Sequence, residues 1–216
     1  MKTFTIGKKK IVLKEEWMVG FITTWIVGLL AHAYRFFNFL PIWDSIYNFT
    51  GVGSTYTLGR WFLGYAGLIT SMFDLPWVNG AFSLFYISIV VILLTEMFEI
   101  KNKGMIVLCA AIFVSFPTVV SSFAYMYTAD AYLLAFLLAT LAVYLTWCVK
   151  KWGTIAGMVC LAFAMGIYQA YATVAIVLVL LYIIRQFVIE KLDFLEAVRK
   201  DLKYLGMLVG GAVLYA

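Results

Sequence analysis

Long apolar runs alternate with short polar connections along most of the chain. Six runs approach the roughly 20 mostly apolar residues that a membrane-spanning helix needs. They cover about 17–34, 79–98, 104–122, 131–149, 152–169 and 171–188. A seventh run begins near Tyr204 and is still apolar at Ala216. The pattern predicts an all-α polytopic helical bundle, in which residues 1–216 form a single membrane domain truncated within its seventh span.

Composition supports a membrane protein. Hydrophobic residues make up 65% of the chain and charged residues 12%, whereas about a quarter of an average soluble domain is charged. The three cysteines, Cys109, Cys148 and Cys160, lie inside apolar runs, which argues against a disulfide framework or a metal site built on thiolates.

The basic residues follow the expected membrane topology. Cytoplasmic loops are enriched in Lys and Arg, and with the N-terminus in the cytoplasm all but two of the 16 basic residues fall on the inner side. Only Arg35 and Arg60 lie outside, together with the acids Asp44, Asp74 and Asp130. The net charge of +5 thus reflects topology and predicts no nucleic-acid partner.

Two segments are predicted to lie along the membrane surface. Residues 35–78 form an outer loop that ends in a helix over 61–78, which lies in the outer interface and is terminated by Pro76, with Trp61 and Trp77 as anchors. A re-entrant packing element is the alternative for 61–78. Residues 189–203 read as a short amphipathic helix on the inner surface.

Asp44 is the leading catalytic candidate. A carboxylate just outside the membrane can remove a proton from an acceptor hydroxyl or hold a divalent cation, and Trp43 beside it offers a stacking surface for a sugar. The structural alternative is that Asp44 caps a short helix starting at Ser45. A divalent cation therefore stays open as a cofactor, with Asp44 as its only candidate ligand.

Arg60 and Arg35 are the candidate phosphate ligands. Guanidinium stays charged and offers paired donors to phosphate oxygens. For Arg35 the structural alternative is strong, because an arginine just past a span commonly reaches lipid headgroups.

Further outer polar residues complete the candidate set. Asp130 could supply a second carboxylate or cap the fourth span, while Tyr127 and Gln169 could hold a sugar or phosphate. His32 is more typical of packing than of catalysis, and Asp74 of a helix end. Asn48–Thr50 matches the glycosylation sequon, and Gly51-x-Gly53 lacks the strand and helix that a nucleotide fingerprint requires.

In its order and placement of short motifs, the chain resembles the multi-spanning glucosyltransferases that modify bacterial O-antigen and related surface glycans, including serotype-converting enzymes of GT-C architecture. The likeness rests on Asp44 followed by Gly59-Arg60-Trp61, then Asp74-Leu75-Pro76-Trp77, then Phe116-Pro117 and Phe123-Ala124-Tyr125 before Asp130, and finally Tyr168-Gln169. Members often have paired acids in the first outer loop, whereas this chain has the single acid of Trp43-Asp44-Ser45.

The resemblance implies an enzyme of the bacterial cytoplasmic membrane with its active site outside. It would move a hexose, glucose by analogy, from a polyprenyl-phosphate-linked donor to a cell-surface glycan, with Asp44 as the essential carboxylate. Arg60, Arg35, Asp130, Tyr127, Gln169 and Trp43 are then expected to bind substrate. A transporter or lipid flippase, or a non-catalytic membrane subunit, are the alternatives; the apolar mid-span positions argue against transport.

Overall fold

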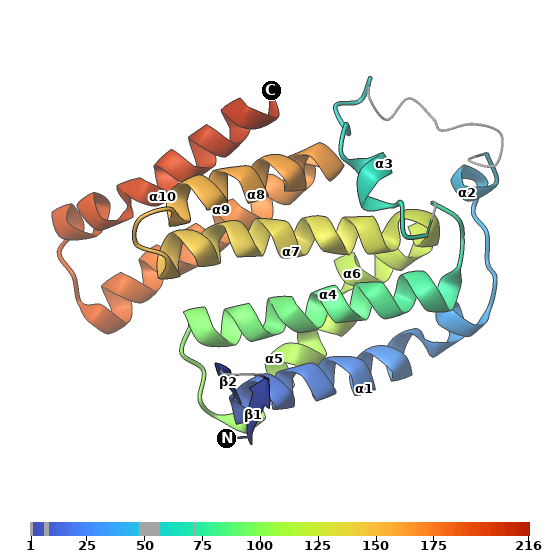
Figure 1. Ribbon diagram of the computed structural model, residues 1–216, viewed down its shortest axis with the longest axis horizontal. Helices are drawn as coiled ribbons and strands as arrows, with labels where there is room; N and C mark the ends of the chain where they lie inside the picture. Colours follow the sequence, from blue (N-terminus) through green and yellow to red (C-terminus); the bar gives the residue numbers. More distant parts are fainter. Residues whose placement is uncertain (1, 7–8, 48–56, 71) are drawn as a thin grey trace.

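The computed structural model describes residues 2–6, 9–47, 57–70 and 72–216. Helices dominate these residues and run roughly parallel or antiparallel to one another (Figure 1). The longer ones are α1 (Glu15–Phe37), α4 (Pro76–Met97), α5 (Lys103–Ser115), α7 (Met126–Cys148), α8 (Gly153–Ile167), α9 (Ala172–Arg185) and α10 (Phe194–Tyr215). Short helical segments are α2 (Trp43–Tyr47), α3 (Leu63–Ala66), α6 (Pro117–Ser122), η2 (Phe123–Tyr125), η3 (Gln169–Tyr171) and η4 (Gln186–Glu190). The all-α polytopic prediction is confirmed.

The six predicted spans correspond to helices, with one interruption. Among the described residues, four stretches are long and apolar enough to cross a membrane: Glu15–Phe37, Pro76–Met97, Lys103–Cys148 and Gln169–Glu190. The third contains a reversal, because α5 leads to α6 and α7 runs back beside α4 (Figure 1). The predicted span 104–122 is therefore broken where Phe116, extended with ψ 140°, precedes Pro117. Proline disfavours the helical conformation in the residue that precedes it.

Helix α7 lies at the centre of the bundle and packs against α4, α8 and α9, while α1 packs against α4 and α5. Small residues permit the closest approach. A Cβ at Gly157 of α8 would lie 2.7 Å from the Ala142 carbonyl oxygen of α7 and 2.6 Å from the Thr146 hydroxyl. A Cβ at Gly153 would likewise collide with the Leu145 carbonyl oxygen of α7, so both glycines permit close packing of α8 on α7.

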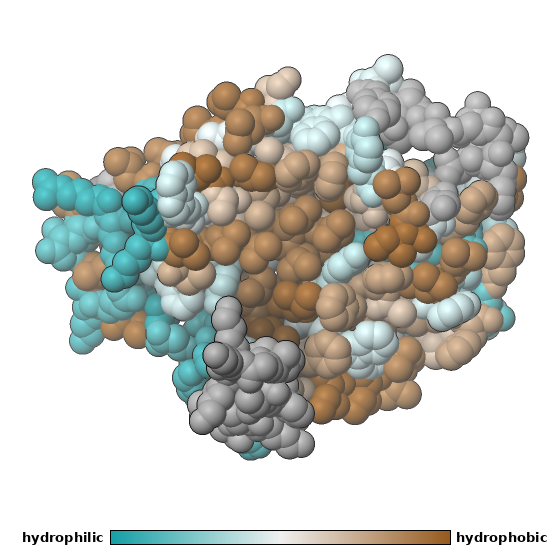
Figure 2. Space-filling view, in the orientation of Figure 1, coloured by the Kyte–Doolittle hydropathy of each residue, from teal (hydrophilic) through white to brown (hydrophobic). Residues whose placement is uncertain are grey.

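The two ends of the bundle differ in polarity. Hydrophilic residues gather at the left of Figure 2, where α7 and α9 end and α10 begins. Here Arg185 pairs with Glu99 at 3.0 Å and with Glu190 at 3.1 Å. We call this the basic end. The opposite end, which carries α2, α3 and α6, is called the cleft end.

Two surface predictions are wrong in detail. The helix predicted over 61–78 exists only as the single turn α3, and Pro76 begins α4 instead of ending a helix. Proline suits a first helical position because the N–H it lacks would have no partner there. The predicted inner helix 189–203 and the seventh apolar run form one helix, α10, after a left-handed turn at Lys191 (φ 52°).

The lysine-rich start of the chain is not helical. It forms an antiparallel hairpin of β1 (Lys2–Ile6) and β2 (Lys9–Leu13), in register Lys2 to Leu13 and Ile6 to Lys9. Nothing in the hydropathy pattern distinguished this segment from a polar tail. The sequon Asn48–Thr50 and the pair Gly51 and Gly53 lie outside the described residues.

Candidate active site

A polar cleft of about 540 Å³ opens at the cleft end. Volumes of this size are typical of small-molecule sites. Its lining combines a carboxylate, a guanidinium and many hydroxyl groups: Asp44, Arg60, Thr118, Ser121, Ser122, Tyr125, Tyr127, Tyr132, Tyr168, Tyr171 and Thr173, with Ala170 and Val174. The sequence predictions Asp44, Arg60 and Tyr127 thus meet in one place.

Asp44 reaches the cleft from the first turn of α2. The start of this short helix is fixed by Ser45, whose hydroxyl accepts from the Ile42 amide at 3.0 Å and lies 2.9 Å from the Ile42 carbonyl. Ser45 is buried and Asp44 is exposed. The helix begins at Trp43, so Asp44 lies within it and does not cap a helix starting at Ser45.

Arg60 enters the cleft because the residue before it has an unusual backbone. Gly59 adopts φ 74°, a left-handed conformation that favours glycine. A side chain there would also collide with the Tyr215 hydroxyl and the Gln169 amide nitrogen. The Arg60 guanidinium carbon lies 4.4 Å from the centre of the Tyr168 ring, a cation–π distance. Its Nε is buried and has no hydrogen-bond partner among the described residues.

The segment that carries Arg60 is fastened to the end of α8. The Phe62 amide donates to the Gly166 carbonyl at 2.8 Å, and the Trp61 ring covers Gly166, where a Cβ would lie 2.7 Å from it. Gln169 Nε2 donates to the Leu58 carbonyl at 2.6 Å and to the Tyr215 hydroxyl at 2.7 Å. Gln169 therefore holds the segment that carries Arg60 in place and is absent from the described cleft lining.

Tyrosines form one wall of the cleft. The ring of Tyr168 lies 5.6 Å from that of Tyr132 and 6.2 Å from that of Tyr171, measured between centroids. Such rings offer an apolar face for a sugar and hydroxyl groups for hydrogen bonds. Together the lining can orient a sugar, accept a proton at Asp44 and hold an anion at Arg60.

Asp130 is absent from the described cleft lining and lies in a buried network, where it is only 3% exposed. Its Oδ2 accepts from the Thr70 hydroxyl and its Oδ1 from the Asn79 amide, both at 3.1 Å. Asn79 in turn accepts from the Leu75 amide at 2.9 Å. Asp130 thus joins α7 to the connection between α3 and α4, and it sits within α7, which begins at Met126, instead of capping it.

Arg35 and Trp43 do not line the described cleft. The Arg35 guanidinium donates to the backbone carbonyls of Phe123 at 2.8 Å, of Ala124 at 3.1 Å and of Leu40. These bonds tie the end of α1 to η2. Trp43 is 78% exposed on the outer face of α2.

Comparison with known protein families decides the class. The model of the family described as Glucosyl transferase GtrII matches residues 33–216, most of the chain. The chain belongs to this family. It is therefore a glycosyltransferase, and the resemblance and the enzyme class inferred from the sequence are confirmed. Neither the curated proteins nor the solved structures contain a match to the chain.

Two polar residues of this GtrII-family chain have places outside the cleft. His32 is buried, with Nε2 2.9 Å from the Val114 carbonyl and its ring 4.5 Å from that of Phe123, which agrees with a packing role. Asp74 is half-buried, and both of its carboxylate oxygens lack hydrogen-bond partners among the described residues.

Any cation in this glucosyltransferase would find few anionic ligands. Among the described residues no group of three His, Cys, Asp or Glu side chains could hold a metal ion, and Asp44 is the one acid in the described cleft lining. Bound metal would depend on Asp44 together with hydroxyl or substrate oxygens.

Most of the hydroxyl groups that line the cleft were not predicted from the sequence. Thr118, Ser121, Ser122, Tyr132 and Thr173 line the cleft but lie within or beside apolar runs, where serine and threonine commonly bond to their own helix. Ser122 does so with the Thr118 carbonyl at 2.9 Å. Apart from the candidate Tyr127, the sequence pointed to this lining only through Tyr125 and Tyr168, as parts of the motifs Phe123-Ala124-Tyr125 and Tyr168-Gln169.

Proposed function

We propose that this glucosyltransferase moves a glucosyl group from a polyprenyl-phosphate-linked donor to a cell-surface glycan, such as O-antigen. In this proposal the cleft end faces outward, the N-terminus lies in the cytoplasm, and the protein resides in the bacterial cytoplasmic membrane. The basic end then lies inside, in keeping with the enrichment of Lys and Arg in cytoplasmic loops.

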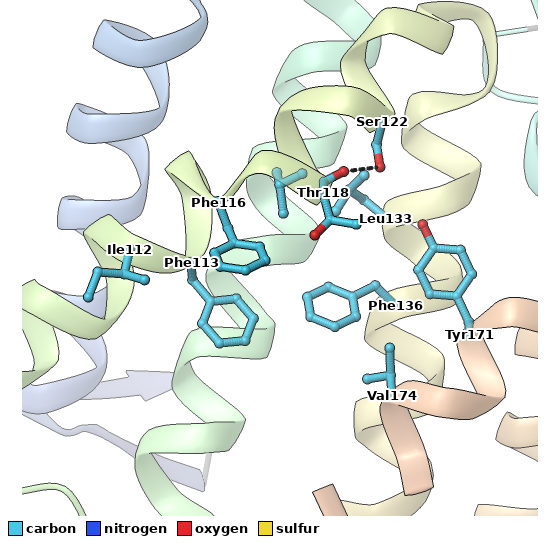
Figure 3. Close-up of a pocket in the computed structure, with 10 residues that line it drawn as sticks. Ile112, Phe113, Phe116, Thr118, Ser122, Leu133, Phe136, Tyr171 and Val174 are labelled. Atoms are coloured by element: carbon cyan, nitrogen blue, oxygen red, sulfur yellow. Dashed lines mark hydrogen bonds between the residues drawn. The ribbon is translucent and has the colours of Figure 1, made fainter. Parts of the chain in front are cut away.

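The supporting observation is that the polar cleft continues into apolar cavities. A cavity of about 380 Å³ adjoins it between α5, α6, α7 and α9, and a further one of about 720 Å³ extends toward the basic end. Thr118 and Val174 line all three spaces. Figure 3 shows the rings of Phe113, Phe116 and Phe136 around the middle cavity. We call the two apolar cavities together the trench.

A donor with a polar head and a long apolar tail suits this arrangement. The phosphosugar would occupy the cleft, and the tail would lie in the trench. Ile112 and Phe116 of the trench wall are 52% and 53% exposed, so the wall reaches the surface that faces lipid. A soluble nucleotide sugar has no apolar tail that could occupy the trench.

The reaction follows from the two charged residues of the cleft. Asp44 takes the proton from an acceptor hydroxyl as its oxygen forms a bond to the anomeric carbon of the donor sugar. The bond from that carbon to the phosphate oxygen breaks, and both of its electrons stay on the phosphate. Arg60 stabilises the charge on the departing polyprenyl phosphate, an effect that is large beside low-dielectric lipid. Attack from the face opposite the phosphate inverts the anomeric centre.

Transfer from polyprenyl-phosphoglucose in detergent, with a defined glycan acceptor, tests the proposal. Asp44→Asn should lower kcat by at least about a hundredfold while its thermal unfolding matches that of the native protein. Arg60→Gln should lower kcat with no loss of folding, whereas Asp193→Asn, far from the cleft at the start of α10, should leave transfer unchanged. An Asp44→Asn protein with native kcat would sink the catalytic assignment.

The same assay separates the alternatives. A flippase would move the donor lipid between leaflets without forming a glycosylated acceptor, and a non-catalytic subunit would do neither. Family membership favours the transferase over both.

A further inference from the structure

The trench has a limited length, and its inner limit is charged. Its lining runs from Tyr171 at the end of η3, beside the cleft, along α9 to Leu181. These two residues are about ten apart, which corresponds to about 15 Å at a rise of about 1.5 Å per residue. Along α5 the lining descends from Phe116 to Cys109.

Ion pairs lie just beyond the trench. Its last described lining residues on α4 and its connection are Phe98 and Ile100, which flank Glu99. Glu99 pairs with Arg185, which lies about one helical turn after Leu181. An apolar chain that continued in the same direction would have to displace these charges from one another, so it must leave sideways into the bilayer.

These dimensions set how much of a tail the protein can hold. An isoprene unit has four chain bonds of roughly 1.5 Å and extends about 4–5 Å along its zigzag. A seat of about 15 Å therefore accommodates about three units. Resting on the proposed function, we infer that the enzyme recognises only the first three or so isoprene units of its lipid donor and leaves the remainder in the bilayer.

The boundary between head and tail lies at shared residues. Ser122 and Tyr171 line both the polar cleft and the adjoining apolar cavity, and Tyr171 points its hydroxyl toward Ser122 in Figure 3. Beyond these two residues the trench lining is mostly aliphatic and phenyl, with a few threonines (Thr95, Thr118, Thr140 and Thr173) and Cys109 among it. The phosphate and the first isoprene unit of the donor therefore meet at Ser122 and Tyr171.

Donors of graded length test the inference. Geranyl, farnesyl, geranylgeranyl and undecaprenyl phosphoglucose are compared in micelles at one fixed detergent concentration. The KM of the native protein should fall about tenfold or more from geranyl to geranylgeranyl as buried apolar area grows. From geranylgeranyl to undecaprenyl it should change less than about threefold, since the extra units touch no protein.

Variants that shorten the trench supply the matched comparison. Val177 lines the trench and is 51% exposed, whereas Leu180 on the same helix is 53% exposed and absent from its described lining. Val177→Trp should abolish the gain in affinity from the third isoprene unit, so that farnesyl and geranylgeranyl donors have no lower KM than geranyl donor. Leu180→Trp should keep the native dependence. Ile112→Trp, which fills the trench from α5, is the second blocking variant if Val177→Trp does not fold.

The outcomes are distinguishable. A KM that keeps falling up to undecaprenyl, one that ignores length, or one that responds equally to Val177→Trp and Leu180→Trp would overturn the inference while leaving the transferase intact. The last of these would indicate that ordinary membrane lipid alone occupies the trench. Failure of every donor with native protein would refute the proposed function, and the inference with it.

Discussion

Substitution of Asp130 separates a structural carboxylate from a substrate-binding one. The sequence predicted that Asp130 binds substrate, but it is 3% exposed and accepts from Thr70 and Asn79 at 3.1 Å each. Asp130→Ala would leave both donors buried without an acceptor. Each such group costs about 1–3 kcal/mol, and Thr70 can turn its hydroxyl toward the Gly67 carbonyl, 3.4 Å away. We expect a loss of about 3 kcal/mol.

Thermal unfolding in detergent measures this loss. For a chain of this size about 3 kcal/mol lowers the midpoint by roughly 6–12 °C. Asp130→Asn, which keeps one acceptor oxygen, should lose about 1 kcal/mol. The matched control is Asp44→Ala, because Asp44 is exposed: its midpoint should not move, while transfer is lost.

The outcome that refutes the structural role is specific. If Asp130→Ala unfolds within about 2 °C of the native protein and yet transfers no sugar, the Asp130 carboxylate contacts substrate. Its hydrogen bonds to Thr70 and Asn79 would then contribute little to stability.

Three further predictions concern residues around the cleft and at the basic end. Arg35→Gln removes bonds to three backbone carbonyls and should lower stability by about 2 kcal/mol with an unchanged donor KM; a raised KM at native stability would instead indicate phosphate binding. Gln169→Leu removes the hydrogen bonds to the Leu58 carbonyl and the Tyr215 hydroxyl, which hold the segment that carries Arg60. The donor KM should therefore rise about fivefold, as for a loss near 1 kcal/mol, and Tyr215→Phe should have a milder effect. A change in kcat with an unchanged donor KM would contradict this. Burial raises the pKa of the Asp201 carboxyl, although the hydrogen bond from Gln186 opposes this. Because the unfolded carboxyl titrates near about 4, the folded chain holds a proton that the unfolded chain releases, and this contribution to stability is complete below about pH 4 and lost as pH rises through the raised pKa. The unfolding midpoint should therefore fall with rising pH by more in native protein than in Asp201→Asn, and parallel curves would refute the assignment.

Much of the architecture could be predicted from residue order alone. Apolar runs and basic clusters are local properties, so the helices and the all-α class followed from hydropathy. The break at Phe116-Pro117 was not predicted, and 104–122 was predicted to be one unbroken span. The helix predicted over 61–78 was wrong because the segment is apolar, as a surface helix would be, but its conformation depends on contacts with the end of α8. The Phe62 amide finds its acceptor at Gly166, about a hundred residues away in the chain.

The candidate site was predicted only in part. Three of the predicted site residues, Asp44, Arg60 and Tyr127, line the same cleft. Their roles stay predictions. Gln169, Arg35 and Asp130 instead hold backbone carbonyls or buried donors. All were polar residues near the same membrane face, and a difference of one position turns a helical side chain by about 100°.

The sequence by itself determined that this chain forms membrane helices, which of their ends are basic, and which few charges lie at the other end, because hydropathy and charge belong to single residues and their neighbours. Only the tertiary structure decided which of those charges faces a cavity. Asp130 is removed from solvent by Thr70 and Asn79, and Asp44 is held at the cleft by a one-turn helix. The trench exists only because α5, α7 and α9, distant in sequence, leave space between their apolar faces. Long-range packing of this kind leaves no mark on a local pattern.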